Sequence, residues 1–141
     1  MPRHPTRSTR IVGVLALLWN LVGVAAFLMQ LVLPAEALQA MSPERRAVHE
    51  ATPAWLYVFY GLATFGGVLG ALGLLLRRRW AAPVFLVALL ALLLQIVAGY
   101  ATTPAWALGG VASLGFPVLL VGVAIALLLF ARRMAARDIL R

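Results

Sequence analysis

The sequence predicts an all-α protein, a four-transmembrane-helix bundle. The chain has 141 residues, of which 64% are hydrophobic and only 11% are charged, whereas soluble domains carry about 25% charged residues. Four long runs contain no charged residue, at about 11–33, 55–76, 80–101 and 108–131. Each run has the roughly 20 residues that a helix needs to cross a bilayer, which open strands cannot cross. We therefore expect residues 1–141 to form one integral membrane domain.

The distribution of arginine predicts the orientation of this bundle. All 12 basic residues are arginines, and ten of them lie before the first run, between the second and third, or after the fourth. These three segments share one side of a four-span protein. The opposite side carries only Arg45 and Arg46, beside Glu36, Glu44 and Glu50. Because short arginine-rich segments stay in the cytoplasm, we expect both termini to be cytoplasmic.

The first run is expected to be a retained helix and not a cleaved signal peptide. Its 23 apolar residues exceed the roughly 7–15 of a signal-peptide core. One stripe of this run, at alternating spacings of three and four, is mostly small or polar and should face protein: Gly13, Ala16, Asn20, Gly23, Phe27, Gln30 and Pro34.

The external loop 34–54 should form one or two short helices at the membrane surface. Ser42 is a favourable N-cap, Pro43 suits the first helical position, and Glu44 complements the helix dipole.

The second run has two small-residue stripes, so its helix should touch two neighbours and be central in the bundle. One stripe contains Ala63, Gly66, Gly70 and Gly73; the other contains Tyr57, Tyr60, Thr64, Gly67 and Ala71. In the third run, the stripe of Ala81, Val84, Ala88, Ala91, Gln95, Ala98 and Thr102 should also face protein. In the fourth run, Ala112, Gly115, Gly122 and Ala126 are small, and we expect Pro117 to kink the helix.

A short repeat indicates a possible duplicated helical hairpin. Thr52-Pro53-Ala54-Trp55 recurs as Thr103-Pro104-Ala105-Trp106, and each copy precedes a run that ends in leucines and arginines. We expect each threonine to cap the helix that follows it. Independent use of the same helix-entry sequence explains the match equally well.

Two residue classes are expected at the membrane interfaces. Trp55, Trp80 and Trp106 should anchor helix ends at the headgroups. Arg77, Arg78, Arg79, Arg132 and Arg133 should contact anionic lipid. This reading accounts for the net charge of +8 without nucleic-acid binding.

The residues that the spans lack argue against an enzyme. No Asp, Glu, His, Lys or Arg lies within the four runs, which disfavours a proton-coupled carrier of the carboxylate type and leaves no intramembrane haem ligand. The chain has no lysine for a Schiff base and no cysteine for thiol or cluster chemistry. His4 and His49 are isolated from each other, so we predict no metal site, cofactor or catalytic residue.

Polar groups at depth are the candidate functional residues: Asn20, Gln30, Gln95, Tyr57, Tyr60 and Tyr100. In one interpretation they hydrogen-bond across helices and fix packing, together with Gly23, Gly66, Gly67, Gly70 and Gly73. In the other they line a cavity that binds a neutral hydroxylated solute.

Several segments resemble a family of small bacterial four-helix membrane proteins often labelled "sugar transporter". The resemblance covers roughly residues 11–95 and is carried by residues 19–24, 27–30, 52–55, 65–70 and 75–81. It implies a bacterial inner-membrane location and a transport-related role, and it assigns no catalytic residue.

Three functions follow as hypotheses. The first is a non-catalytic accessory or scaffolding subunit that packs against other integral membrane proteins. The second is a homodimeric transporter or channel for a small neutral solute such as a sugar. The third is a lipid-handling protein that uses the arginine rim.

Overall fold

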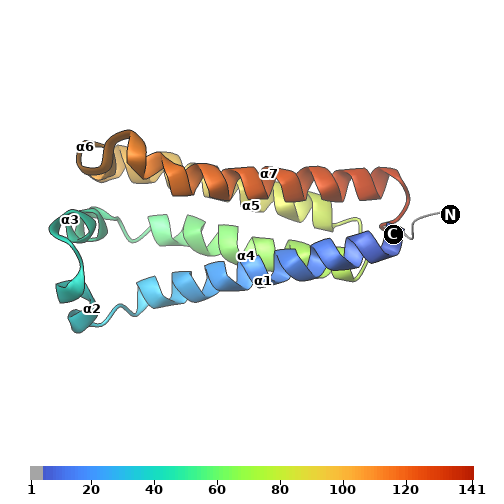
Figure 1. Cartoon of the computed structure of the whole chain (residues 1–141), viewed down its shortest axis with the longest axis horizontal. Coiled ribbons are helices and arrows are strands. Elements are labelled where there is room, and N and C mark those ends of the chain that lie inside the picture. The colour runs from blue at the N-terminus through green and yellow to red at the C-terminus, as the bar shows by residue number, and fades with distance from the viewer. Residues whose placement is uncertain (1–4) are drawn as a thin grey trace.

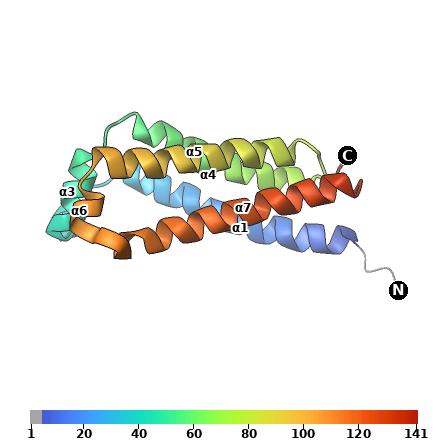
Figure 2. The same ribbon diagram turned by 90° about the horizontal axis from the view of Figure 1, so that it is seen from above.

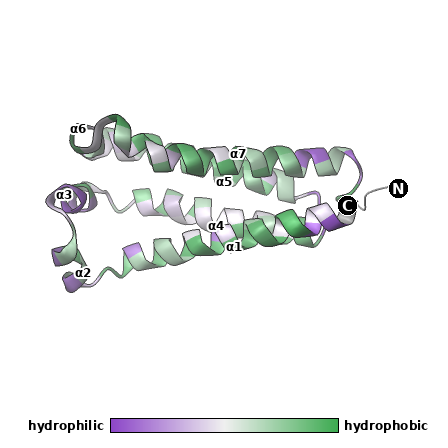
Figure 3. Ribbon diagram, viewed as in Figure 1, coloured by the Kyte–Doolittle hydropathy of each residue, from purple (hydrophilic) through white to green (hydrophobic). Residues whose placement is uncertain are grey.

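The structure is a computed structural model that describes residues 5–141, and this part of the chain contains helices and no strand (Figure 1). Four segments are long and apolar enough to cross a membrane: Arg7–Leu31, Leu56–Leu75, Ala81–Thr102 and Ala105–Ala136. Hydrophobic residues fill these segments, and hydrophilic ones gather at the two ends of the bundle (Figure 3). The prediction of an all-α bundle is confirmed, and the chain has the architecture of a multi-pass membrane protein.

The four long helices are joined by short ones. α1 (Pro5–Leu31) leads through α2 (Ala35–Ala40) and α3 (Pro43–Ala51) to α4 (Leu56–Leu75). After a tight turn, α5 (Ala81–Thr102) leads through α6 (Ala105–Gly109) and the 3₁₀ helix η1 (Gly110–Leu114) to α7 (Gly115–Ala136). We call the end with α2, α3 and α6 the loop end, and the end with residues 77–80 and 137–141 the arginine end (Figures 1 and 2).

Helix α4 packs against both α1 and α5, and α7 packs against α5. The two glycine-containing stripes of α4 account for this arrangement because each meets a different neighbour. On the α1 side, the ring of Phe27 covers Gly61, Thr64 lies against Gly23, and Gly67 lies under the amide of Asn20. A Cβ added at Gly23 would stand 3.3 Å from Thr64 Cγ2.

The second stripe of α4 brings α5 equally close. Phe85 covers Gly70, and a Cβ at Gly70 would lie only 2.7 Å from its ring. Gly73 faces Trp80 and Ala81, and Gly66 faces Ala88. The missing Cβ atoms of these glycines therefore leave room on α4 for side chains of both neighbouring helices.

Helix boundaries follow local sequence signals. α4 and α5 lie within one residue of the predicted runs, whereas α1 begins earlier, at Pro5, and ends before Pro34. The 34–54 loop forms two short helices, α2 and α3. The Ser42 hydroxyl accepts a hydrogen bond from the backbone N–H of Arg45 at 3.3 Å, which is the predicted cap of α3.

The fourth run differs from the prediction in where it bends. The kink expected at Pro117 is instead a break before it, where η1 separates α6 from α7. Gly110 has φ 57° and ψ −148°, a conformation open essentially only to glycine. Pro117 lies in the first turn of α7, where its missing N–H removes no helical hydrogen bond.

The two repeated threonines also act differently from the prediction. Thr52 ends α3 and Thr103 ends α5, so each caps the helix before it, although the Thr103 hydroxyl also accepts a hydrogen bond from the Ala105 N–H at the start of α6, at 3.4 Å. The Thr52 hydroxyl donates to the Val48 carbonyl at 2.7 Å, and the Thr103 hydroxyl donates to the Gly99 carbonyl at 2.5 Å. The two copies thus share one local structure, although α4 continues without interruption whereas α6 breaks after five residues.

The apolar core lies toward the arginine end. It includes Leu74 of α4, Phe85 and Leu89 of α5, and Leu128 and Met134 of α7. Helices α4, α5 and α7 thus pack tightly together at this end.

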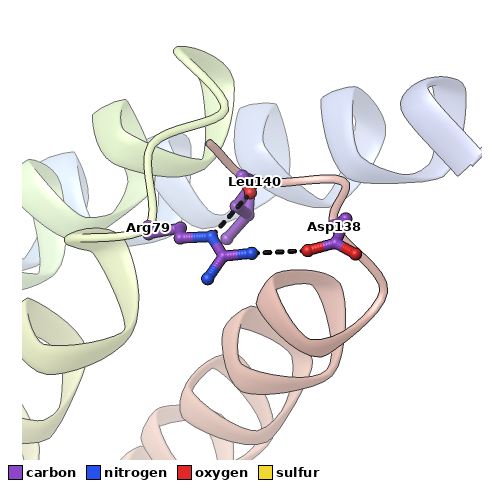
Figure 4. Close-up of polar contacts among 3 residues, drawn as sticks. All are labelled: Arg79, Asp138 and Leu140. Carbon is purple, nitrogen blue, oxygen red and sulfur yellow. Dashed lines mark hydrogen bonds and ion pairs between the residues drawn. The ribbon is translucent and has the colours of Figure 1, made fainter.

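The last residues of the chain fold back onto the α4–α5 turn. Arg141 and Arg77 are joined by a backbone hydrogen bond of 2.7 Å, and the Arg79 N–H donates to the Arg141 carbonyl at 2.9 Å. The Arg79 guanidinium also binds the Leu140 carbonyl at 3.2 Å and the Asp138 carboxylate at 2.5 Å (Figure 4). Leu140 is 1% exposed, so this segment covers the end of the core.

Candidate functional site

A cavity of about 380 Å³ occupies the loop end of the bundle. Its wall comes from α1, α4 and α5, and α3, α6 and η1 contribute its rim. The cavity lies at the loop end because the buried cluster holds α4, α5 and α7 together at the arginine end.

Four of the six predicted polar residues line this cavity: Gln30, Tyr57, Tyr60 and Gln95. They come from three helices and are up to 65 positions apart in sequence. Within residues 5–141, none of these four side-chain polar groups makes a hydrogen bond to the protein. Amide and phenol groups in an apolar setting gain free energy from a hydrogen-bonding partner, which water or a solute in the cavity can supply.

Asn20 lies outside the cavity lining and is a packing residue. Its amide donates to the Ala16 carbonyl, one turn earlier in the same helix, at 2.8 Å. Its Oδ1 fills the space beside Gly67. Asn20 thus makes neither the cross-helix hydrogen bond nor the cavity contact that the sequence suggested, because the close approach of α4 confines its side chain.

Tyr100 stabilises the broken segment at the cavity rim. Its hydroxyl donates to the Ser113 carbonyl at 2.9 Å and lies 2.9 Å from the Ser113 hydroxyl. Ser113 in turn donates to the Gly110 carbonyl at 2.7 Å. The Tyr100 ring also packs edge-to-face with Trp106 of α6, with ring centroids 6.3 Å apart. Tyr100 is therefore the one predicted polar residue that bonds across elements in the described structure.

Stacked aromatic rings of α1 and α4 lie beside the cavity. Phe27 stacks on Tyr60, with ring centroids 5.2 Å apart and planes 23° apart, and it makes an edge-to-face contact with Phe65. Phe27 is 9% exposed. This explains why one bulky residue interrupts the small stripe of α1.

The rim contains residues that the sequence analysis did not assign to a site. Glu44, Arg45 and His49 of α3 line the cavity together with Ser113 of η1. Their only sequence signal is their place in the short loops that cap the loop end. Charged groups are thus confined to the rim, while the deeper wall presents neutral amides and phenols.

The predicted interfacial residues lie at the two ends. Trp55, Trp80 and Trp106 are 49%, 39% and 50% exposed, and Trp80 also packs over Gly73. Arg78, Arg132 and Arg133 are exposed. Arg77 and Arg79 also bind the last residues of the chain, through the Ile139 and Leu140 carbonyls, at 3.4 and 3.2 Å.

No protein-family model, curated protein or solved structure matches the chain. The geometry of the site therefore carries the functional argument. Two amides and two phenols can donate to and accept from hydroxyl groups without a charged ligand partner. The volume lies within the roughly 300–1,000 Å³ range of small-molecule sites.

Proposed function

We propose that this protein is a non-catalytic membrane protein that binds a small, neutral, hydroxylated solute, such as a sugar, in the cavity at its loop end. One observation carries this proposal: Gln30, Tyr57, Tyr60 and Gln95 converge on one cavity from three helices, and their polar groups make no hydrogen bond to any of residues 5–141. The resemblance of residues 11–95 to the family labelled "sugar transporter" points to the same class of solute.

A transport role extends this proposal. The cavity lies at the loop end, while the core around Leu74, Phe85 and Leu128 closes the arginine end. Release on the other side of the membrane therefore requires this core to separate, which is the usual requirement of alternating access.

The orientation belongs to the same proposal. The arginine excess at one end favours a cytoplasmic position for both termini, in the inner membrane of a bacterium. The loop-end cavity then faces the external side and takes solute from there.

Uptake into proteoliposomes tests the proposal. Gln30→Leu and Gln95→Leu remove one amide each from the cavity wall, and each should reduce solute uptake at least tenfold. Gln39→Leu is the matched control, because Gln39 is exposed on α2 and does not line the cavity. Uptake that is unchanged in both cavity variants would contradict the proposal.

The second candidate is an accessory subunit that packs against other membrane proteins. The observation in its favour is the outer face of α7, where Gly115 and Gly122 have no described atom within 4 Å of an added Cβ. Small residues are typical of helix–helix contacts in membranes, and Ala112 and Ala126 are exposed as well. Mild detergent purification from the native membrane, followed by mass spectrometry, tests this role. A protein that always purifies without a partner would exclude it.

A further inference from the structure

The C-terminal segment pairs Arg141 with Arg78 of the α4–α5 turn. The Arg141 N–H donates to the Arg77 carbonyl at 2.7 Å, and the Arg141 carbonyl accepts from the Arg79 N–H at 2.9 Å. In parallel strands two such hydrogen bonds flank a pair of directly opposed residues, which here are Arg78 and Arg141. Opposed side chains leave the backbone on the same face, with their Cβ atoms about 5 Å apart. Two arginines that are far apart in sequence therefore stand side by side.

No side chain among residues 5–141 neutralises this pair. Asp138 is the only acidic side chain of the described residues at the arginine end, and it is bound to Arg79. Arg78 and Arg141 are both exposed, and neither guanidinium group makes a hydrogen bond or an ion pair to residues 5–141. Like charges directly opposite each other destabilise a pair of strands. An anion held between the two guanidinium groups removes this cost.

The position of Arg78 favours a lipid as the source of this anion. Arg78 lies between the ends of two membrane-spanning segments, Leu56–Leu75 and Ala81–Thr102. Two positions away on either side, Leu76 and Trp80 are exposed, as expected at the border between hydrocarbon and head groups. A soluble anion gains nothing from these apolar side chains. A phospholipid places its phosphate beside the arginines and its acyl chains beside Leu76 and Trp80.

We propose that Arg78 and Arg141 together bind the phosphate group of an anionic phospholipid. Guanidinium groups bind phosphate oxygens through paired, charge-assisted hydrogen bonds. Phosphatidylglycerol carries no cation of its own, so its charge is available to both arginines, whereas the ammonium group of phosphatidylcholine neutralises its phosphate. The site lies at the opposite end of the bundle from the polar cavity, so this inference is independent of the proposed function.

The bound lipid joins two parts of the chain at the arginine end. Arg78 belongs to the α4–α5 turn, and Arg141 follows Leu140, which is buried over the end of the core. A phosphate held by both arginines stabilises this closed arrangement, because it binds only where the two segments are paired. This effect differs from the general attraction of arginine to an anionic membrane, which amounts to about fivefold per residue and needs no particular arrangement.

Lipid binding to the full chain in dodecyl maltoside tests the inference. Native mass spectrometry gives the dissociation constant of dioleoylphosphatidylglycerol, with dioleoylphosphatidylcholine as the zwitterionic comparison. Thermal unfolding with each lipid, and with inorganic phosphate, reports stabilisation. Arg78→Gln and Arg141→Gln each remove one member of the pair. Arg133→Gln on α7 and Arg45→Gln at the loop end are the matched controls, because each removes one charge from an exposed position.

We expect each variant of the pair to weaken phosphatidylglycerol binding at least tenfold and each control to weaken it less than threefold. The double variant should bind less than threefold more weakly than either single variant, because one arginine alone cannot bridge the phosphate. Without lipid, Arg78→Gln should unfold at the same temperature as the parent or a higher one, since the repulsion is removed.

Three results would overturn the paired site. Equal weakening by Arg78→Gln and Arg133→Gln, or effects that multiply in the double variant, would show a diffuse basic surface. Phosphatidylcholine that binds as tightly as phosphatidylglycerol would exclude selection by charge. A rise in the unfolding temperature of the parent that is as large with inorganic phosphate as with phosphatidylglycerol would exclude the lipid as the ligand.

Discussion

The side-chain oxygen of Asn20 on α1 occupies the space that a Cβ at Gly67 on α4 would need. This contact is one of those that set the distance between the two helices, together with Thr64 on Gly23 and Phe27 on Gly61. Gly67→Ala should therefore destabilise the bundle by about 1–3 kcal/mol through overpacking. Reversible unfolding in mixed micelles would measure the change.

Two controls make this prediction specific. Gly122→Ala on α7 meets open space and should be neutral or stabilising by up to about 1 kcal/mol, the helix-propensity difference between the residues. Asn20→Ala removes the obstructing atoms, so it should restore most of the stability lost in Gly67→Ala. A double variant as unstable as the sum of its single changes would show that the two residues are not coupled.

The C-terminal segment should be held by burial more than by charge. Arg79 and Asp138 form an ion pair, but their side chains are 57% and 84% exposed, and exposed pairs contribute only about 0–1 kcal/mol. Asp138→Asn should thus lower the free energy of unfolding by less than 1 kcal/mol. Leu140→Ala removes a side chain that is 1% exposed and should cost about 2–4 kcal/mol. A larger loss of unfolding free energy in Asp138→Asn than in Leu140→Ala, measured by denaturant titration, would contradict this view.

The backbone of Asp138 provides a separate test at this end. Asp138 has φ 56°, and its N–H and that of Ile139 bond back to Ala135 and Met134, which is a Schellman helix end. Asp138→Gly should be near neutral or stabilising in thermal unfolding, because glycine adopts positive φ freely. A loss of more than about 1 kcal/mol would mean that the ion pair matters more than the exposed side chains imply.

Tyr100 should control the order of the cavity rim. Tyr100→Phe removes the hydroxyl that binds Ser113, so amide hydrogen exchange across residues 109–114 should accelerate at least tenfold, equivalent to about 1.4 kcal/mol. Tyr57→Phe is the matched control, since the Tyr57 hydroxyl makes no hydrogen bond within the described residues. Equal exchange in the two variants would argue against this role of Tyr100.

The absence of cysteine from the sequence makes the orientation directly testable. Gln39→Cys places a thiol on exposed α2, and Ala136→Cys places one at the exposed end of α7. A membrane-impermeant maleimide added to intact cells should label the first and not the second. Labelling of Ala136→Cys alone would reverse the proposed orientation.

Periodicity and composition predicted the fold well because only a few backbone structures can cross a bilayer. Uncharged runs of the right length must be helices, and the bounds of α4 and α5 agree with the predicted runs within one residue. The two stripes of α4 predicted two neighbours, since glycine is informative about packing even before the partner is known. The break after Gly109 was missed, because the positive φ of Gly110 depends on how α6 folds over the loop end.

The long helices, their small faces and the neutral character of their polar residues can be predicted from the sequence alone, because these properties are local and repeat at the period of a helix. Which polar residues share a cavity depends on how the helices pack. Gln30, Tyr57, Tyr60 and Gln95 meet at one cavity, whereas Asn20, on the same stripe as Gln30, is confined against Gly67. The physical reason is the distance between helices, which is set along the whole bundle by side chains far from the cavity.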